Sequence, residues 1–181
     1  MKTITLILSG VILMAVLTLG ADPEFNKDGE LVRPKNYREW IFLSSGVGMN
    51  YGTGPLPFGN VFVEPSAYHK FVETGKWPDK TIFALEVRKP ATEGSINKGG
   101  QYQTSLITLE AAVKDTARFP DGWGYFGFSG GVATAKVFGA EGGCNACHIK
   151  NAAVEHTFVQ FYPTLLEIAI AKKTLNPSYK P

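Results

Sequence analysis

The sequence has little cysteine, histidine or methionine, and almost no excess of either charge. Its 181 residues include two cysteines, three histidines and three methionines, and 18 basic residues nearly balance 16 acidic ones. A net charge of +2, spread along the chain, excludes the clustered basic surface by which proteins bind nucleic acids. The chain also has no internal repeats and no low-complexity tracts. With 44% hydrophobic residues it is long enough to bury one core, so we expect one globular domain.

Long hydrophobic runs are absent too, apart from one near the start. The stretch from Ile4 to Leu19 follows a single lysine and is interrupted by Ser9 and Gly10. It is shorter than the roughly 20 apolar residues that a membrane-spanning helix needs. Residues 1–20 are therefore predicted to be a bacterial secretory signal peptide, cleaved near Gly20, with residues 21–181 as the mature domain. The alternative is an uncleaved membrane anchor; in either case the rest of the chain is exported to the periplasm.

The two cysteines and one of the three histidines share a single pentapeptide, within "GGCNACHIKNA". A disulfide between Cys144 and Cys147 would close a very small loop and constrain the unfolded chain little. A redox-active pair would normally follow a strand in an α/β setting. The histidine that follows directly, His148, favours another interpretation, because Cys-x-x-Cys-His is the attachment signature of a c-type haem. We predict one covalently attached haem c, with both cysteines as thioether anchors and His148 as the iron ligand.

A second strong iron ligand is missing from the usual place. Electron-carrying cytochromes commonly use a methionine after the motif, but residues 149–181 contain none. Met49, in a glycine-rich loop, is the one candidate, and it defines a weaker hypothesis of an electron-transfer cytochrome. His156 lies too close to the motif to reach the opposite face of the haem, and His69 is expected on the surface of a helix. The sequence thus favours an open sixth position and small-molecule chemistry.

Periodicity and turn residues predict an α+β domain, a mainly antiparallel β-sheet with flanking helices and the haem motif after the last strand. A helix is expected from Ser66 to Thr74, ended by Gly75, and another from about Pro163. Whether "LEAAVKD" ends a strand or turns helical stays open. The predicted strands lie at residues 41–48, 60–64, 80–89 and 122–131.

Several segments together resemble the cytochrome P-460 family. They are "EFNKDGEL", "PKNYREW", "LEAAVKD", "ARF", the haem motif and "FVQFYP", in order and with compatible spacing. The resemblance implies a periplasmic homodimer with a β-rich fold, a five-coordinate c-type haem and a possible redox-partner cytochrome.

One branch of that family oxidises hydroxylamine to nitrous oxide or nitrite. Its members carry a lysine cross-linked to the porphyrin and a carboxylate near the distal face. Here the resemblance places Leu85 at the lysine position, with Lys80 and Lys89 several residues away on either side. Glu110 is the best candidate for the carboxylate. Such an enzyme is the alternative function.

The other branch, the cytochromes c-prime-beta, lacks the lysine and has phenylalanines over the iron. By this resemblance Phe58, Phe62, Phe83 and Leu85 form the distal wall, the last two sharing a strand face by the period of two. An apolar wall suits nitric oxide and carbon monoxide, which bind without a hydrogen-bond donor. The first hypothesis is therefore a gas-binding haem protein for detoxification, sensing or transport.

Overall fold

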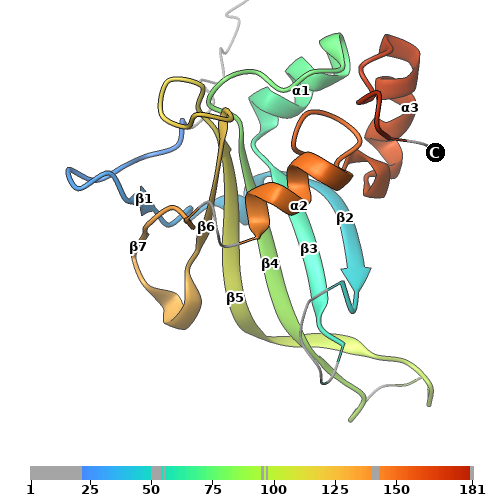
Figure 1. Cartoon of the computed structure of the whole chain (residues 1–181). Helices are drawn as coiled ribbons and strands as arrows, with labels where there is room; N and C mark the ends of the chain where they lie inside the picture. Colours follow the sequence, from blue (N-terminus) through green and yellow to red (C-terminus); the bar gives the residue numbers. More distant parts are fainter. Residues whose placement is uncertain are drawn as a thin grey trace, which may run out of the picture.

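A curved antiparallel sheet forms the centre of the molecule (Figure 1). The computed structural model describes residues 22–49, 54, 56–94, 96, 98–139 and 143–179. The signal-peptide prediction lies outside these residues. Neighbouring strands of the five-stranded sheet follow one another in the chain, in the order β2-β3-β4-β5-β6. The strands are β2 (Ile41–Val47), β3 (Phe58–Val63), β4 (Ile82–Ala91), β5 (Tyr102–Lys114) and β6 (Trp123–Gly127), and a separate pair joins β1 (Leu31–Val32) to β7 (Thr134–Ala135).

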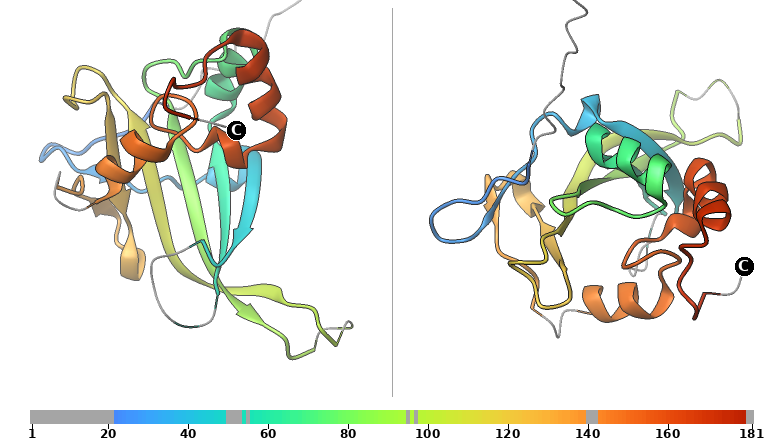
Figure 2. Two further views of the ribbon diagram at one scale, coloured as in Figure 1. Left: turned by 45° about the vertical axis from the view of Figure 1, so that its right-hand side comes forward. Right: turned by 90° about the horizontal axis from the view of Figure 1, so that it is seen from above.

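The described residues form three α-helices that pack beside the sheet, and together with it they confirm the predicted α+β class. Figure 2 shows α2 standing off from one face of the sheet, with α1 and α3 side by side at one end. No described helix has both the length and the apolar character needed to cross a membrane. The helices are α1 (Pro65–Thr74), α2 (Cys144–Asn151) and α3 (Pro163–Lys172), with short 3-10 turns η1 (Tyr37–Glu39), η2 (Ser129–Gly131) and η4 (Val159–Phe161).

The ends of α1 and α3 follow the predicted signals. The carboxylate of Glu64 accepts hydrogen bonds from the amides of Ser66 and Ala67 at the start of α1, and Gly75 ends that helix at φ 73°. Proline occupies the first turn of both helices. These local rules place the helices correctly because they depend on neighbouring residues alone.

The segment whose structure the sequence left open is a strand throughout. β5 continues to Lys114 because "LEAAVK" pairs with β4 on one side and with β6 on the other. Leu109, Ala111 and Val113 are buried on one face of the sheet, so the chain alternates with a period of two. Tertiary pairing here outweighs the helical preference of Leu, Glu and Ala.

The sheet separates two hydrophobic cores. Phe83 belongs to the core beneath α1 and α3, whereas its neighbours Ile82 and Ala84 belong to the core on the other face. The first core also includes Trp77, Trp123 and the aromatic residues around the motif helix. The position of α2 over this first face makes it the side on which the candidate site lies.

Candidate functional site

The three motif residues share one face of helix α2. Cys144, Cys147 and His148 stand at positions i, i+3 and i+4, which lie next to one another on a helix surface. The helix begins after Gly143, whose φ of 76° few other residues adopt readily. The two thiols form no disulfide with each other. The pattern that suggested haem attachment is therefore presented in a geometry where two thiols and an imidazole can act on one group.

The imidazole of His148 is held in one orientation. Its Nδ1 atom lies 2.7 Å from the backbone carbonyl of His156, and its ring sits 4.4 Å from that of Tyr125 and 4.3 Å from that of Phe158. Because a carbonyl oxygen only accepts hydrogen bonds, the proton is on Nδ1 and Nε2 has a free lone pair. Burial lowers the pKa of His148, so the ring is neutral at neutral pH. A neutral histidine whose second nitrogen donates to a carbonyl is the usual form of a metal ligand.

A cavity of about 860 Å³ separates α2 from the sheet. This volume is within the range of roughly 300–1,000 Å³ seen for sites of small molecules and cofactors. Most of its lining is apolar. The motif side contributes Cys144, Cys147, His148, His156, Phe158 and Phe161, and the sheet side contributes Gly59, Val61, Phe83, Leu85, Val87 and Glu110.

Three neighbouring strands build the sheet wall. Val61, Leu85 and Glu110 are paired in register across β3, β4 and β5, so their side chains form one row on the cavity face. A methyl group at Gly59 would meet Leu85 Cδ1 at 3.3 Å, so the glycine leaves room for the leucine. Leu85 is thus at the centre of the wall that faces α2.

Four residues were predicted for the distal wall, and the structure separates them into two pairs. Phe83 and Leu85 both line the cavity, as their shared strand face requires. Phe58 and Phe62 do not line it. They belong to the alternate set of β3 residues, and Phe62 packs on the opposite face of the sheet, 5.7 Å from Tyr37 and 5.6 Å from Phe42. The placement of these two phenylalanines in the wall is therefore corrected, because the pleat directs them away from it.

Glu110 lines the cavity without a partner. It forms no hydrogen bond or ion pair with any residue that the structure describes, and burial raises the pKa of its carboxyl group. Burial, and after it the charge of Glu110, raises the pKa of the thiol of Cys144, which lines the same cavity. The predicted carboxylate is thus inside the cavity, on a strand rather than on the helical turn that had been considered.

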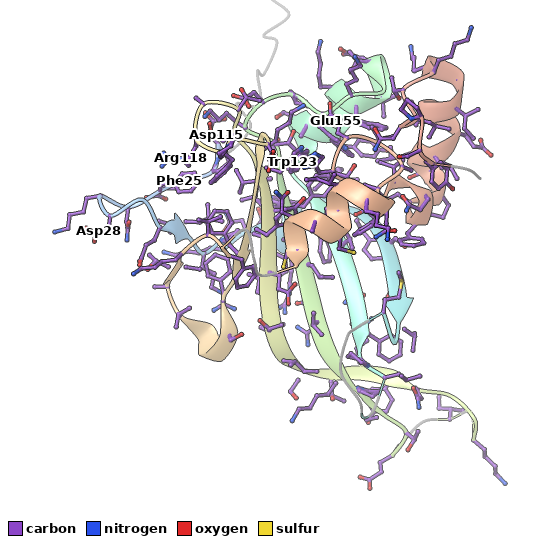
Figure 3. The ribbon with its side chains drawn as sticks, in the orientation of Figure 1. Phe25, Asp28, Asp115, Arg118, Trp123 and Glu155 are labelled. Atoms are coloured by element: carbon purple, nitrogen blue, oxygen red, sulfur yellow. The ribbon has the colours of Figure 1, made fainter. Side chains whose placement is uncertain are left out.

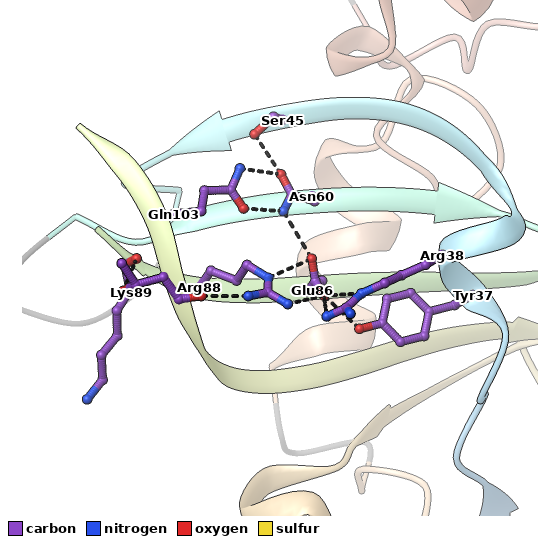
Figure 4. Close-up of polar contacts among 9 residues, drawn as sticks. Tyr37, Arg38, Ser45, Asn60, Glu86, Arg88, Lys89 and Gln103 are labelled. Atoms are coloured by element: carbon purple, nitrogen blue, oxygen red, sulfur yellow. Dashed lines mark hydrogen bonds and ion pairs between the residues drawn. The ribbon is translucent and has the colours of Figure 1, made fainter. Parts of the chain in front are cut away.

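No lysine is among the described residues that line the cavity. Lys80 lies in the turn before β4, where its Nζ is 2.5 Å from a carboxylate oxygen of Asp115. Lys89 is exposed and points away from the sheet in Figure 4. Neither lysine that flanks Leu85 in the sequence reaches the space between Leu85 and His148.

The other candidate ligands lie as follows. Met49 is at the rim of the cavity, 63% exposed, with its sulfur packed over Gly46. His69 is exposed on α1, as expected. His156 is not on the motif helix, because α2 ends at Asn151. It approaches His148 from the turn beyond, through its backbone carbonyl.

Sequence reasoning missed the groups that hold the imidazole. They are Tyr125, Phe158 and the His156 carbonyl, to which the Tyr125 hydroxyl also donates at 3.4 Å. The sequence predicts a strand in this region, but no short-range signal connects β6 with the turn after α2.

The site fits a haem. It combines two thiols and one oriented imidazole on a helix face with a mostly apolar cavity against a sheet. Separately, the described residues contain no group of three or more acidic, histidine or cysteine side chains that could hold a metal ion. A comparison with protein families finds that the family model described as Cytochrome P460 matches residues 34–159. No curated protein matches the chain.

Proposed function

Because the chain belongs to the cytochrome P460 family, a family of haem proteins, we propose that it is a gas-binding cytochrome with one covalently attached haem c. Cys144 and Cys147 hold the porphyrin through thioether bonds, and His148 binds the iron through Nε2. The ligand we propose is nitric oxide, with carbon monoxide as its laboratory equivalent.

One observation carries this proposal, namely that Val61 and Leu85 build the wall opposite His148 and that no lysine is among the described residues lining the cavity. The side chains of Val61 and Leu85 offer no donor atom as a sixth ligand and no hydrogen bond to hold water, and the carboxyl group of Glu110 lies beside them at the end of the same row. Diatomic gases bind without such a bond, so the wall discriminates in their favour. When bound, the haem supplies an iron with one open position.

The residues of this chain then have separate tasks. The Nδ1–H of His148 donates to the His156 carbonyl, which fixes the direction of Nε2. The rings of Tyr125 and Phe158 keep the imidazole from rotating. Phe83 and Leu85 exclude water from the opposite side of the cavity. Gas capture needs no proton, so Glu110 has no task in this function.

A second candidate, oxidation of hydroxylamine, is favoured by Glu110 itself. A carboxyl group with a raised pKa in a cavity is a typical proton carrier. Against this function stands the absence of a lysine at the cavity among the described residues. Intact-mass and peptide mapping distinguish the two functions, since a cross-linked porphyrin has three protein attachments and a gas-binding one has two.

The central test is the absorption spectrum of the reduced protein with and without carbon monoxide and nitric oxide. We expect a high-spin five-coordinate spectrum that both gases change. Leu85→Gln should lower carbon monoxide affinity about tenfold, since a buried amide draws water into the cavity. The matched control is Leu106→Gln, because Leu106 lies beside Tyr37 and Arg38, away from the cavity, and it should leave affinity unchanged.

A low-spin six-coordinate spectrum before gas is added would contradict the proposal. If Met49→Ala then converted that spectrum to a high-spin one, the electron-transfer hypothesis would be supported instead.

We further propose that residues 1–20 export the chain to the periplasm, that it forms a homodimer and that a cytochrome is its redox partner. The composition of the leader and the family resemblance support these statements. Cell fractionation, the N-terminal sequence of the mature protein and its sedimentation in solution test them.

A further inference from the structure

The turn after the motif helix contains a backbone conformation that needs support. Glu155 has a φ of 50°, a value uncommon for residues with a side chain. It immediately precedes His156, whose carbonyl accepts a hydrogen bond from Nδ1 of His148. Non-glycine residues in this region persist only where their surroundings hold them. Figure 3 shows Glu155 on the segment that follows α2, near the upper end of the sheet.

An ion pair holds the side chain of Glu155. The Nζ atom of Lys114, at the end of β5, lies 2.8 and 3.0 Å from the two carboxylate oxygens of Glu155. The same Nζ donates to the backbone carbonyl of Trp77 at 2.7 Å. Both charged side chains are mostly buried, with 16% and 24% of their surfaces exposed. Solvent therefore screens this pair less than a surface pair.

Hydrogen bonds from two further parts of the chain hold the same turn. The side-chain amide of Asn176 donates to the carbonyls of Glu155 and Ala152, each at 2.8 Å. The indole of Trp77 donates to the hydroxyl of Thr157 at 2.8 Å. Residues 152–157 are thus fixed to β5, to the segment after α1 and to the C-terminal segment at once.

We propose that the Lys114–Glu155 ion pair is a positioning device for the proximal ligand, which sets the strength of the His148 hydrogen bond and thereby the reduction potential of the iron. This inference rests on the proposed function only in assuming that a haem is bound through His148. Lys114 and Glu155 touch neither the imidazole nor the cavity. They act through the backbone that leads from Glu155 to the His156 carbonyl.

The direction of the effect follows from the basicity of the ligand. A short hydrogen bond from Nδ1–H to a carbonyl makes the imidazole a stronger base, which stabilises ferric iron more than ferrous iron. Loosening the turn weakens that bond. At a fixed external potential, the ratio of ferrous to ferric iron then rises.

The test replaces both charges together. Removing Lys114 alone would leave an unpaired negative charge near the iron and shift the potential by itself. In Lys114→Met/Glu155→Gln the net charge of the pair stays at zero while the ion pair is lost. We expect the ratio of ferrous to ferric protein at a fixed potential to rise about threefold, as for a weakened hydrogen bond. Hydrogen exchange in residues 152–158 should become faster.

A matched control comes from α1. Lys70 and Glu73 form a pair with an N–O distance of 3.0 Å, but on an exposed surface that does not contact the turn. Lys70→Met/Glu73→Gln should leave both the potential and the exchange unchanged. Lys114→Arg, which keeps the ion pair, should have the same reduction potential as the wild type.

The outcomes separate this inference from the proposed function. Faster exchange with an unchanged potential would overturn it, because the pair would then support only the turn. If the double variant does not accumulate, the neutral variant Asn176→Ala takes its place and should shift the potential in the same direction. If the protein carries haem and the double variant has a shifted reduction potential, but no gas binds, then gas capture alone is refuted. If the protein is isolated without haem, the proposed function is refuted.

Discussion

The two faces of the central sheet each carry a glutamate, one buried and one half-buried, and the pKa values of the two carboxyl groups are shifted in opposite directions. Glu86 on β4 faces away from the cavity and is only 4% exposed. Arg38 and Arg88 pair with it, and Tyr37 donates a hydrogen bond to it at 2.7 Å (Figure 4). These partners overcome burial and lower the pKa of Glu86 to about 2. On the cavity face, burial without a partner raises the pKa of Glu110.

The difference indicates which face has a structural role and which has a chemical one. A buried carboxylate surrounded by donors is a satisfied network, and its members fix one another. A buried carboxyl group without donors costs stability, and such groups concentrate where proteins perform chemistry. The satisfied network thus lies on the face away from the cavity, and the carboxyl group with a raised pKa lies on the cavity face.

The largest effect that tests this contrast is expected from Glu86→Gln. It leaves Arg88 beside a neutral amide in a mostly buried position, which should lower the free energy of unfolding by about 3 kcal/mol. Urea denaturation at pH 7 measures it. Glu73→Gln, in an exposed pair, is the control and should change stability by less than about 1 kcal/mol.

The stability that is lost in Glu86→Gln should also depend on pH, in a direction that the pKa shift defines. Because the pKa of Glu86 falls from its ordinary value of 4.5 to about 2 on folding, its contribution is complete above pH 4.5 and is lost as the pH falls toward 2. The stability difference between wild type and Glu86→Gln should narrow over this window. A constant difference would show that the pKa of Glu86 does not change on folding.

A smaller loss is expected from Tyr37→Phe. The variant keeps the ring contact with Phe62 and removes one hydrogen bond to Glu86, so it should lower stability by about 1 kcal/mol. Tyr102→Phe provides the comparison, because its hydroxyl donates to the Glu93 carbonyl at 2.6 Å in an exposed position. Equal losses of stability of the two variants in urea denaturation would show that the buried hydrogen bond to Glu86 contributes no more than an exposed one.

The same two faces show how far the sequence could predict the structure. The two ends of α1 and the start of α3 depend on neighbouring residues, and short-range rules placed them. The pleat also put Phe83 and Leu85 on one strand face. Phe62 was misplaced because its face depends on the register between β3 and β4, where it pairs with Ala84 rather than Leu85.

The residues that hold the turn behind His148 could not be predicted from the sequence, for a related reason. Trp77, Lys114 and Asn176 converge on one turn from three distant parts of the chain. Each is unremarkable in its own segment. Only the topology that brings the end of β5 and the C-terminal segment to the turn after α2 gives them a common role.

The smallest expected change in the free energy of unfolding is that of Glu110→Gln, and it is an increase rather than a decrease. Since burial raises the pKa of Glu110, its carboxyl group costs stability at pH 7, and the neutral amide should raise the free energy of unfolding by up to about 1 kcal/mol. As the pH falls through the raised pKa toward the ordinary 4.5, the wild type becomes protonated and the gain of the variant should fade. Urea denaturation at pH 7 and pH 5 measures both, with Glu167→Gln on exposed α3 as a control that should change neither. A loss of stability at pH 7 would mean that Glu110 has a stabilising partner in the haem-loaded protein, and the contrast between the two faces would then lose its electrostatic basis.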